Sequence, residues 1–362
     1  MENIFSLPPY EMLSGNKQRL LVDRLNQLNV HHQKRCEPYR KIHRAWGTLG
    51  REFDMLEEFP FLPIRLFKDF DLMSITQEEV IKTLTSSGTT SSEVSKIYLD
   101  RTTSQYQTKA LSIIIQDFIG KRRLPMLIID SRDVIKNRRQ YSARGAGLLG
   151  FSNFGRDHCY ILDENMSLKL DELQGFLDVH RGETVLLFGF TFMVWQHFYK
   201  ELTRRGISPD LKDGILIHSG GWKKLSEEAV DNITFKRALN EVCGIRQVHN
   251  FYGMVEQVGS VFMECGEGYF HAPVYSDIIV RETDNWSALG FKQPGIVELV
   301  SVLPHSYPGH VLLTEDMGEI IGEDDCPCGR KGKYFHVVGR VPKAEIRGCS
   351  DTYALEDEAH AV

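Results

Sequence analysis

Long hydrophobic runs are missing from this sequence of 362 residues. Its most apolar stretch, Thr184 to Trp195, has 12 residues, whereas a helix needs about 20 apolar residues to cross a bilayer. The N-terminus also lacks the basic segment followed by an apolar one that marks a secretory signal. These absences predict a soluble, cytoplasmic protein without a membrane span.

The sequence also has few cysteines and no excess of positive charge. Seven cysteines are too few for a disulfide scaffold, and their odd number leaves a thiol unpaired, as is usual in a reduced cytosolic protein. A net charge of −6 gives no general attraction to nucleic acid. The composition, 42% hydrophobic and 25% charged, is ordinary for a globular protein and excludes disorder and collagen. The length predicts about two domains.

Short apolar runs alternate with helical patterns through the first two thirds of the chain. Such alternation favours an α/β fold, with a mostly parallel sheet covered on both faces. We expect buried strands at 125–130, 184–190, 214–221 and 247–253, and helices at 194–206 and 224–242.

The N-terminal region has a different pattern. Leucines at helical spacing predict an amphipathic helix over 16–35 with a solvated basic face. Residues 104–120 are helical in pattern, whereas the aromatic, proline-punctuated segment 59–70 is predicted to be extended and packed on the body of the protein.

After residue 260 the strand-like segments alternate more regularly and are separated by Gly and Pro turns, which predicts a smaller antiparallel β unit. We find no internal repeats and no low-complexity linker. We expect an α/β core over 1–260, including the N-terminal helical segment. A β subdomain over 261–338 and a C-terminal tail over 339–362 follow it.

The strongest local signal is the segment LTSSGTTSSEVSK at 84–96, where hydroxyl side chains flank one glycine and a lysine follows. Hydroxyls, backbone N–H groups and an ammonium can together wrap a polyphosphate. The segment is not a Walker loop, and a plain Ser/Thr-rich surface turn is the alternative interpretation. The candidate phosphate-binding residues are Ser86, Ser87, Gly88, Thr89, Thr90 and Lys96.

This loop resembles the phosphate-binding loop of the adenylate-forming enzymes, the superfamily of acyl-CoA synthetases and luciferases. Further matches follow in the order of that superfamily, although Val255 stands where a Thr is usual and Glu315 where a Gly is usual. They are a Gly-rich turn on the adenine side at Ser219, Gly220 and Gly221, a Y-G-x-T-E-like motif from Tyr252 and Gly253 to Glu256, a T-G-D-like motif ending at Asp316, and a hinge-like Gly339-Arg340.

Longer segments from about 55 to 355 resemble one branch, the acyl-protein synthetases of the bacterial bioluminescence fatty-acid reductase complex. The resemblance implies that a long-chain fatty acid is activated with ATP to an acyl-AMP. The acyl group then forms a thioester with a cysteine of the enzyme and passes to a reductase. The implied partners are the fatty acid and the acyl reductase and acyl-transferase subunits of an oligomeric complex.

The resemblance also implies roles for single residues. Glu256 would hold Mg²⁺, Tyr252 would stack near the adenine, and Asp316 would accept hydrogen bonds from the ribose hydroxyls. Lys96 and Arg340 join Glu256 as candidate catalytic residues. A turn carboxylate at Asp316 and a helix N-terminal charge at Glu256 remain the alternatives.

The C-terminal region departs from the superfamily. Only 22 residues follow Arg340, so we expect no C-terminal domain, no late catalytic lysine from it and no coenzyme A tunnel. Lys333 or Lys343 could replace that lysine. Cys349 is the candidate acyl acceptor, because Gly348 gives flexibility and Arg347 favours the thiolate.

Other cysteines predict a metal site. Cys326-Pro-Cys328 and the upstream pair Cys265 and His271 supply three thiols and one imidazole, a plausible tetrahedral zinc set that would staple the small β unit. Four unrelated buried residues are the alternative.

Two further functions stay open. The chain could be an acyl- or aryl-CoA ligase, or a carrier-protein ligase, of a biosynthetic pathway. It could also be a degenerate nucleotide-binding subunit that regulates a partner, since Val255 and Glu315 depart from the superfamily motifs.

Overall fold

The computed structural model describes residues 2–86, 94–135, 143–222 and 228–341. Two compact units divide them: unit 1 holds 2–86, 94–118 and 252–341, and unit 2 holds 119–135, 143–222 and 228–251. These divisions fall at other positions than the predicted domain boundaries, because the N-terminal segment belongs with the strands after residue 252.

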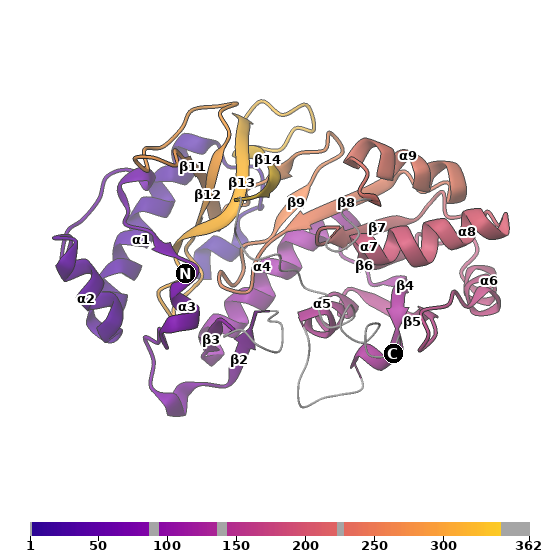
Figure 1. The fold of residues 1–362 in the computed structure, drawn as a ribbon, viewed down its shortest axis with the longest axis horizontal. Helices are drawn as coiled ribbons and strands as arrows, with labels where there is room; N and C mark the ends of the chain where they lie inside the picture. Colours follow the sequence, from indigo (N-terminus) through magenta and orange to yellow (C-terminus); the bar gives the residue numbers. More distant parts are fainter. Residues whose placement is uncertain (1, 87–93, 136–142, 223–227, 342–362) are drawn as a thin grey trace. The chain divides into compact units, whose positions relative to one another are not determined.

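Unit 2 is built on a parallel sheet in the strand order β8-β7-β6-β4-β5 (Figure 1). This confirms the predicted parallel sheet and four of its strands, while β5 escaped prediction. The strands are β4 (Leu124–Ser131), β5 (Gly155–Leu162), β6 (Leu186–Phe190), β7 (Ile215–Ser219) and β8 (Gln247–Tyr252).

Helices cover both faces of this sheet. Phe151 stacks on Phe188 of β6 with ring centroids 4.3 Å apart. The preceding residue of the strand, Leu187, belongs to a core cluster with Phe198 and Leu239. Successive residues of a strand point to opposite faces, so β6 is buried from both sides. The helices are η4 (Arg132–Ile135), α5 (Ala143–Ser152), α6 (Leu170–Val179), α7 (Thr191–Met193), the π-helical η5 (Val194–Tyr199), α8 (Lys200–Arg205) and α9 (Asn232–Cys243).

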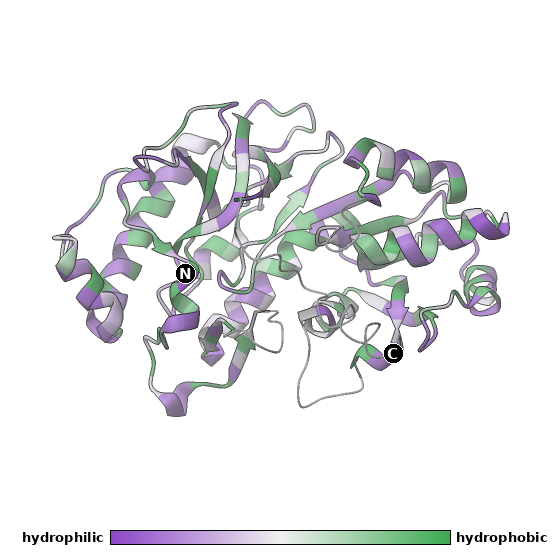
Figure 2. Ribbon diagram, viewed as in Figure 1, coloured by the Kyte–Doolittle hydropathy of each residue, from purple (hydrophilic) through white to green (hydrophobic). Residues whose placement is uncertain are grey.

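Helix bounds in unit 2 follow local capping signals. Helix α9 begins at Asn232, because the Asp231 side chain accepts a hydrogen bond from the backbone N–H of Thr234 at 2.7 Å. It ends at Cys243, because the next residue, Gly244, adopts a φ of 77°, which suits glycine. The predicted start at 224 was therefore wrong for the described residues 228–231. The helix predicted over 194–206 is confirmed as η5 and α8, and Figure 2 shows α8 and α9 as alternating hydrophobic and hydrophilic bands.

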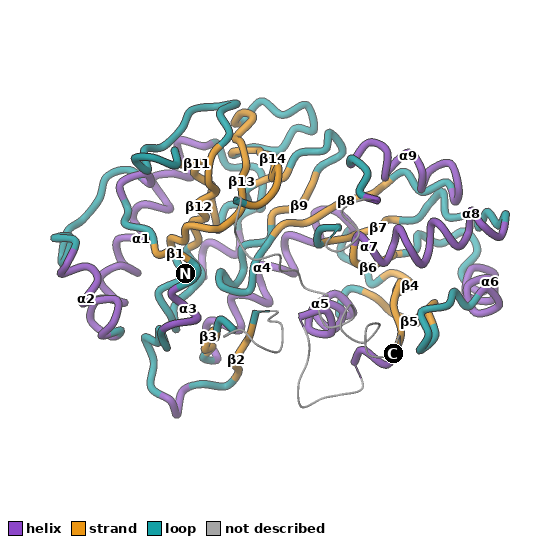
Figure 3. Tube along the Cα trace, in the orientation of Figure 1, coloured by secondary structure: helices purple, strands orange, loops and turns teal. Residues whose placement is uncertain are grey.

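Unit 1 holds the predicted antiparallel strands, in the order β11-β12-β13-β14-β10-β9 (Figure 3). Strand β1 (Leu62–Pro63) pairs with β13 in parallel, and β2 (Lys82–Thr85) and β3 (Lys96–Leu99) form a separate hairpin. The remaining strands are β9 (Phe262–Glu264), β10 (Phe270–His271), β11 (Ser276–Arg281), β12 (Gly295–Ser301), β13 (Val311–Glu323) and β14 (Lys333–Arg340).

The N-terminal segment supplies the helices of unit 1. The predicted helices at 16–35 and 104–120 are confirmed as α1 and α4, but the segment 59–70 is not wholly extended, since Leu66–Asp69 forms one helical turn. The basic face of α1 is not fully solvated either: Lys17 is buried and donates to the carbonyl of Ala272 at 2.9 Å. The elements are η1 (Glu2–Ser6), α1 (Ser14–Arg35), α2 (Glu37–Ala45), η2 (Leu56–Glu58), α3 (Leu66–Asp69), η3 (Gln77–Glu79) and α4 (Arg101–Ile119).

Within the described part of the chain, no helix is both long and apolar enough to cross a membrane.

A histidine cluster fills the junction of α1, α2 and the segment before β13. His31 lies against His305 and His32 against His310, with ring centroids 4.1 and 5.0 Å apart. Burial lowers the pKa of His43 to about 4 and that of His310 to about 3. Burial also lowers the pKa of the other three histidines.

Acid should therefore destabilise the fold through these histidines. Below pH 6.5 the unfolded chain protonates His43 while the folded chain does not, so its contribution to stability is lost as the pH falls toward about 4. We expect His43→Gln to flatten the pH dependence of the unfolding free energy by about 1.4 kcal/mol per pH unit between these limits. Urea unfolding at several pH values measures the slope.

The slopes of wild type and variant must be compared with each other, because Glu298 changes the unfolding free energy with pH in the opposite direction. Burial raises its pKa to about 7, so this carboxyl group adds stability as the pH falls from 7. His158→Gln removes an exposed histidine and is the matched control. Parallel slopes for wild type and His43→Gln would contradict the prediction.

Candidate active site

A carboxylate, a phenol and a guanidinium from three separate motifs meet in unit 1. Asp316 and Arg340 face each other across β13 and β14, with Arg340 Nε 3.4 Å from Asp316 Oδ1. The hydroxyl of Tyr252 donates to Asp316 Oδ2 at 2.7 Å. The backbone N–H of Asp316 donates to Thr314 Oγ1 at 3.0 Å. Both carboxylate oxygens are thus held in place.

Tyr252 is fixed by its surroundings. Its ring lies among Phe262, Phe270 and Phe335, with centroids 6.1 to 6.3 Å away. Burial and the neighbouring Asp316 raise the pKa of Tyr252, which keeps its hydroxyl a donor. The hydroxyl of Tyr252 thus bonds to Asp316 and its ring lies against phenylalanines, and stacking on adenine remains a prediction. The following Gly253 is required, because a Cβ there would lie 2.8 Å from the Ser260 carbonyl oxygen.

Glu256 is a buried carboxyl group four residues beyond Tyr252. It is 8% exposed, and burial raises its pKa, although the Ser95 side chain and the charge of Lys68 oppose the rise. A desolvated carboxyl group of this kind favours a cation as its partner.

The Ser/Thr-rich segment starts and ends in an ordered hairpin. Thr85 of β2 faces Lys96 of β3, and the exposed Lys96 side chain begins that strand. The backbone N–H of Ser86 donates to the Ser95 carbonyl at 3.1 Å, and the N–H of Ser95 donates to Ser86 Oγ at 3.0 Å. The other predicted loop residues, Ser87, Gly88, Thr89 and Thr90, lie outside the described residues, as does the predicted acceptor Cys349.

The predicted glycine turn begins at the end of β7 in unit 2. Ser219 Oγ donates to the Phe251 carbonyl at 3.1 Å, Gly220 has φ 85°, and Gly221 follows it. Thr191 and His218, which sequence reasoning missed, lie beside this turn, with Thr191 Oγ1 2.9 Å from His218 Nδ1. Ligands of such sheets usually bind at the carboxyl ends of the parallel strands. Thr191 directly follows the buried strand β6, and this position of a polar residue could have identified it from the sequence.

Lys333 is not available for chemistry in the way the sequence suggested. It is 6% exposed, and its ammonium donates to the Ile278 carbonyl at 3.0 Å and lies 3.9 Å from Asp277. These contacts hold the Lys333 ammonium inside unit 1. Lys343 lies outside the described residues.

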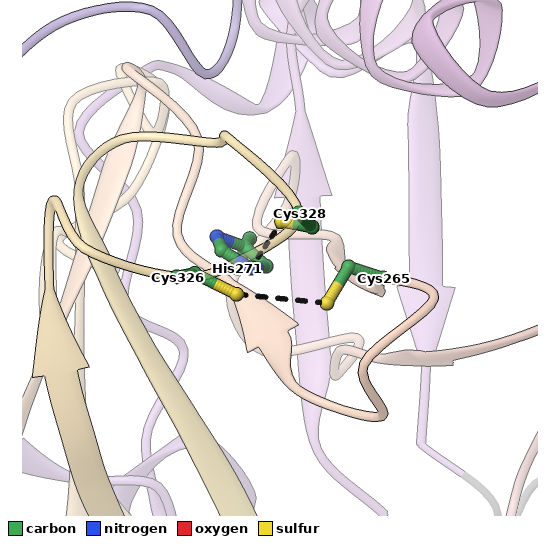
Figure 4. Close-up of side chains that lie close together, drawn as sticks. All are labelled: Cys265, His271, Cys326 and Cys328. Atoms are coloured by element: carbon green, nitrogen blue, oxygen red, sulfur yellow. Dashed lines mark hydrogen bonds between the residues drawn. The ribbon is translucent and has the colours of Figure 1, made fainter.

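The four predicted metal ligands converge in unit 1 (Figure 4). The candidate ligand atoms of Cys265, His271, Cys326 and Cys328 all lie within 4.8 Å of one another. Cys265 Sγ is 4.0 Å from Cys326 Sγ, and Cys328 Sγ is 3.4 Å from His271 Nε2. We call these four residues the Cys/His cluster.

A family model described as acyl-protein synthetase, LuxE, matches residues 1–356. The chain is similar to the long-chain-fatty-acid-luciferin-component ligase of Vibrio harveyi. The two are 22% identical over 353 residues, which cover 93% of this chain and 88% of that protein.

The solved structures most relevant to the fold are those of a 2-hydroxyisobutyryl-CoA ligase. Its open conformation with 2-HIB-AMP and CoA has a TM-score of 0.71 at 16% identity and covers 92% of this chain and 77% of its own. Its thioesterification state has a TM-score of 0.71 at 15% identity, with 92% and 70% covered. At this identity the likeness shows the fold alone, and it confirms the predicted fold class of the adenylate-forming enzymes.

Proposed function

Because the chain belongs to the acyl-protein synthetase family, and is thus an acyl-protein ligase, we propose that it activates a long-chain fatty acid with ATP and then acylates one of its own cysteines. The acyl group passes from that cysteine to an acyl reductase in a cytoplasmic complex. The similarity to the long-chain-fatty-acid-luciferin-component ligase of Vibrio harveyi supports the substrate class.

Two steps make up the reaction. The fatty carboxylate attacks the α-phosphorus of ATP, so that an acyl-AMP forms and pyrophosphate leaves. A cysteine thiolate then attacks the acyl carbon, a thioester forms and AMP leaves. The first step depends on positioning and on stabilising phosphate charge rather than on covalent work by the protein.

The observation that carries the proposal is the meeting of Tyr252, Asp316 and Arg340. A carboxylate can accept hydrogen bonds from both hydroxyls of a ribose, and here one phenol and one guanidinium hold it in a fixed orientation. Glu256 suits Mg²⁺, which prefers oxygen ligands and would neutralise phosphate charge when bound. Lys96, at the end of the Ser/Thr-rich segment, offers an ammonium to the phosphates.

Pyrophosphate exchange into ATP tests the activation step. We expect labelled pyrophosphate to enter ATP when the wild-type chain receives Mg²⁺ and a long-chain acid, and not with aryl acids. Omission of Mg²⁺ is the control, and no exchange is expected without it.

Other outcomes would overturn the proposal in different ways. AMP release that requires free CoA and leaves no acyl group on the protein would favour a CoA or carrier-protein ligase. No exchange with any acid would favour a regulatory nucleotide-binding subunit.

A further inference from the structure

We propose that the Cys/His cluster binds one zinc ion, which ties the β9–β10 hairpin to the connection between β13 and β14 and is structural rather than catalytic. The ligands are Cys265, His271, Cys326 and Cys328. This site is separate from the proposed activation chemistry and goes beyond it.

The distances match a tetrahedral zinc site. With Zn–S bonds of about 2.3 Å and Zn–N bonds of about 2.0–2.1 Å, two sulfurs lie about 3.8 Å apart and a sulfur and a nitrogen about 3.6 Å apart. The Cys265 and Cys326 sulfurs are 4.0 Å apart, and Cys328 Sγ is 3.4 Å from His271 Nε2. Figure 4 shows the side chains turned toward a common centre from three stretches of chain.

Local turns orient the cysteine thiols toward one another. The N–H of Gly329 donates to the Cys326 carbonyl at 2.9 Å, and the φ of 86° at Gly329 lets the chain turn back so that both thiols reach one point. On the other arm, the N–H of Cys265 donates to the Tyr269 carbonyl at 2.9 Å, which closes the turn from β9 to β10. His271, on β10, then lies beside the thiols.

The chemistry of the ligands selects zinc. Thiolates and imidazole bind zinc well, whereas Mg²⁺ and Ca²⁺ need oxygen ligands. Four protein ligands leave no open position for water, as is typical of a structural site. Binding releases the thiol protons and leaves a net charge of −1, since three thiolates surround one divalent ion. Positive charge is close by, since Arg330 follows Cys328 by two residues and the buried ammonium of Lys17 donates to the carbonyl of Ala272, the residue after His271.

The position of the cluster explains what zinc does for the fold. It joins the β9–β10 turn to the connection between β13 and β14, and the pairing of those two strands shifts register at Met317/Gly318 and at Ile320/Gly322. Each shift is a bulge-like interruption of the β13–β14 ladder, where the pairing hydrogen bonds are locally lost. A metal at one end of the hairpin holds the alignment that places Arg340 opposite Asp316 at the other end.

Metal analysis of the purified full-length chain, expressed with zinc in the medium, tests the proposal. We expect one zinc per chain, released by a thiol-specific mercurial, and a thiolate-to-metal absorption band after replacement by cobalt. Cys328→Ser should lose the zinc and lower the melting temperature by about 5–10 °C. Cys159→Ser, at a half-buried cysteine outside the cluster, should keep both.

His271→Cys keeps the proposal testable if Cys328→Ser fails to fold. It replaces imidazole by a thiolate and should still bind one zinc. Less than a tenth of a zinc per chain in the wild type, no cobalt band, or a Cys265–Cys326 disulfide in wild-type protein purified under reducing conditions would each overturn the proposal.

Discussion

Cys349→Ser is expected to exchange pyrophosphate at the wild-type rate and to retain no acyl label on the protein. Without a dedicated general base, a serine hydroxyl is a far weaker nucleophile at neutral pH than a cysteine thiol. The acyl-AMP should therefore form and stay unconsumed. Incubation with radioactive fatty acid and ATP, followed by neutral hydroxylamine, distinguishes a thioester from an ester or amide.

The described cysteines give a structural reason for this choice. Cys36 and Cys243 are buried, and burial raises the pKa of both thiols, that of Cys243 to about 12. Burial also raises the pKa of the half-buried Cys159. Cys265, Cys326 and Cys328 belong to the Cys/His cluster. The seventh cysteine of the sequence, Cys349, follows Gly348 and Arg347 and lies outside the described residues.

Cys159→Ser is the matched control, because Cys159 is more exposed than Cys36 and Cys243. It should label like the wild type, and transfer of the acyl group to an added reductase subunit should continue. Equal labelling of Cys349→Ser and wild type would mean that the acceptor is another thiol, and a CoA or carrier-protein ligase would become the better interpretation.

Asp316→Asn should lower the rate of pyrophosphate exchange by about 10²–10³-fold, the usual loss when a preorganised polar contact is removed from an active site. The amide replaces a charged acceptor that Tyr252 and Arg340 hold in place. It loses one of the two oxygens that a ribose would need. Initial rates at varied ATP, with a fixed fatty acid, measure the effect on kcat/KM.

Asp71→Asn offers a matched control in the same unit. Asp71 also accepts a hydrogen bond from a tyrosine, Tyr98, at 2.7 Å, but this pair is exposed. We expect a rate close to that of the wild type. A similar loss in both variants would point to a general effect on the fold and would remove Asp316 from the nucleotide site.

Lys96→Ala and Glu256→Gln extend the same prediction to the phosphate side, each with a loss of about 10²–10³-fold. Glu256→Gln should in addition require more Mg²⁺ for half-maximal rate, because the amide is a weaker ligand than the carboxylate. Unchanged Mg²⁺ dependence would place the metal elsewhere.

The sequence predicted best what is local. Buried strands, glycine-ended helices and the C-x-C arm of the Cys/His cluster all depend on neighbours within a few residues. Short motifs also located Tyr252 and Asp316, although only the folded chain shows that the phenol donates to the carboxylate across 64 residues of sequence.

Long-range packing was beyond prediction. Leu62 pairs with Leu312 across β1 and β13, so the N-terminal segment lies in the same unit as the late strands. A two-residue strand carries no periodicity of its own, and the same holds for the one-turn helix at Leu66–Asp69. Burial of Lys333 also depends on Asp277 and Ile278, which no local pattern connects to it.

The buried carboxyl group of Glu256 makes the binding of a divalent cation at this position depend on pH. Because burial raises its pKa, a divalent cation that binds there competes with a proton for the same oxygens. Cation binding at this position would release a proton, and the apparent affinity would rise with pH until the carboxyl group is ionised throughout. Acid would then weaken occupancy of the site by protonating one side chain, while the buried histidines between α1 and β13, which take up protons when the chain unfolds, lower the stability of the fold.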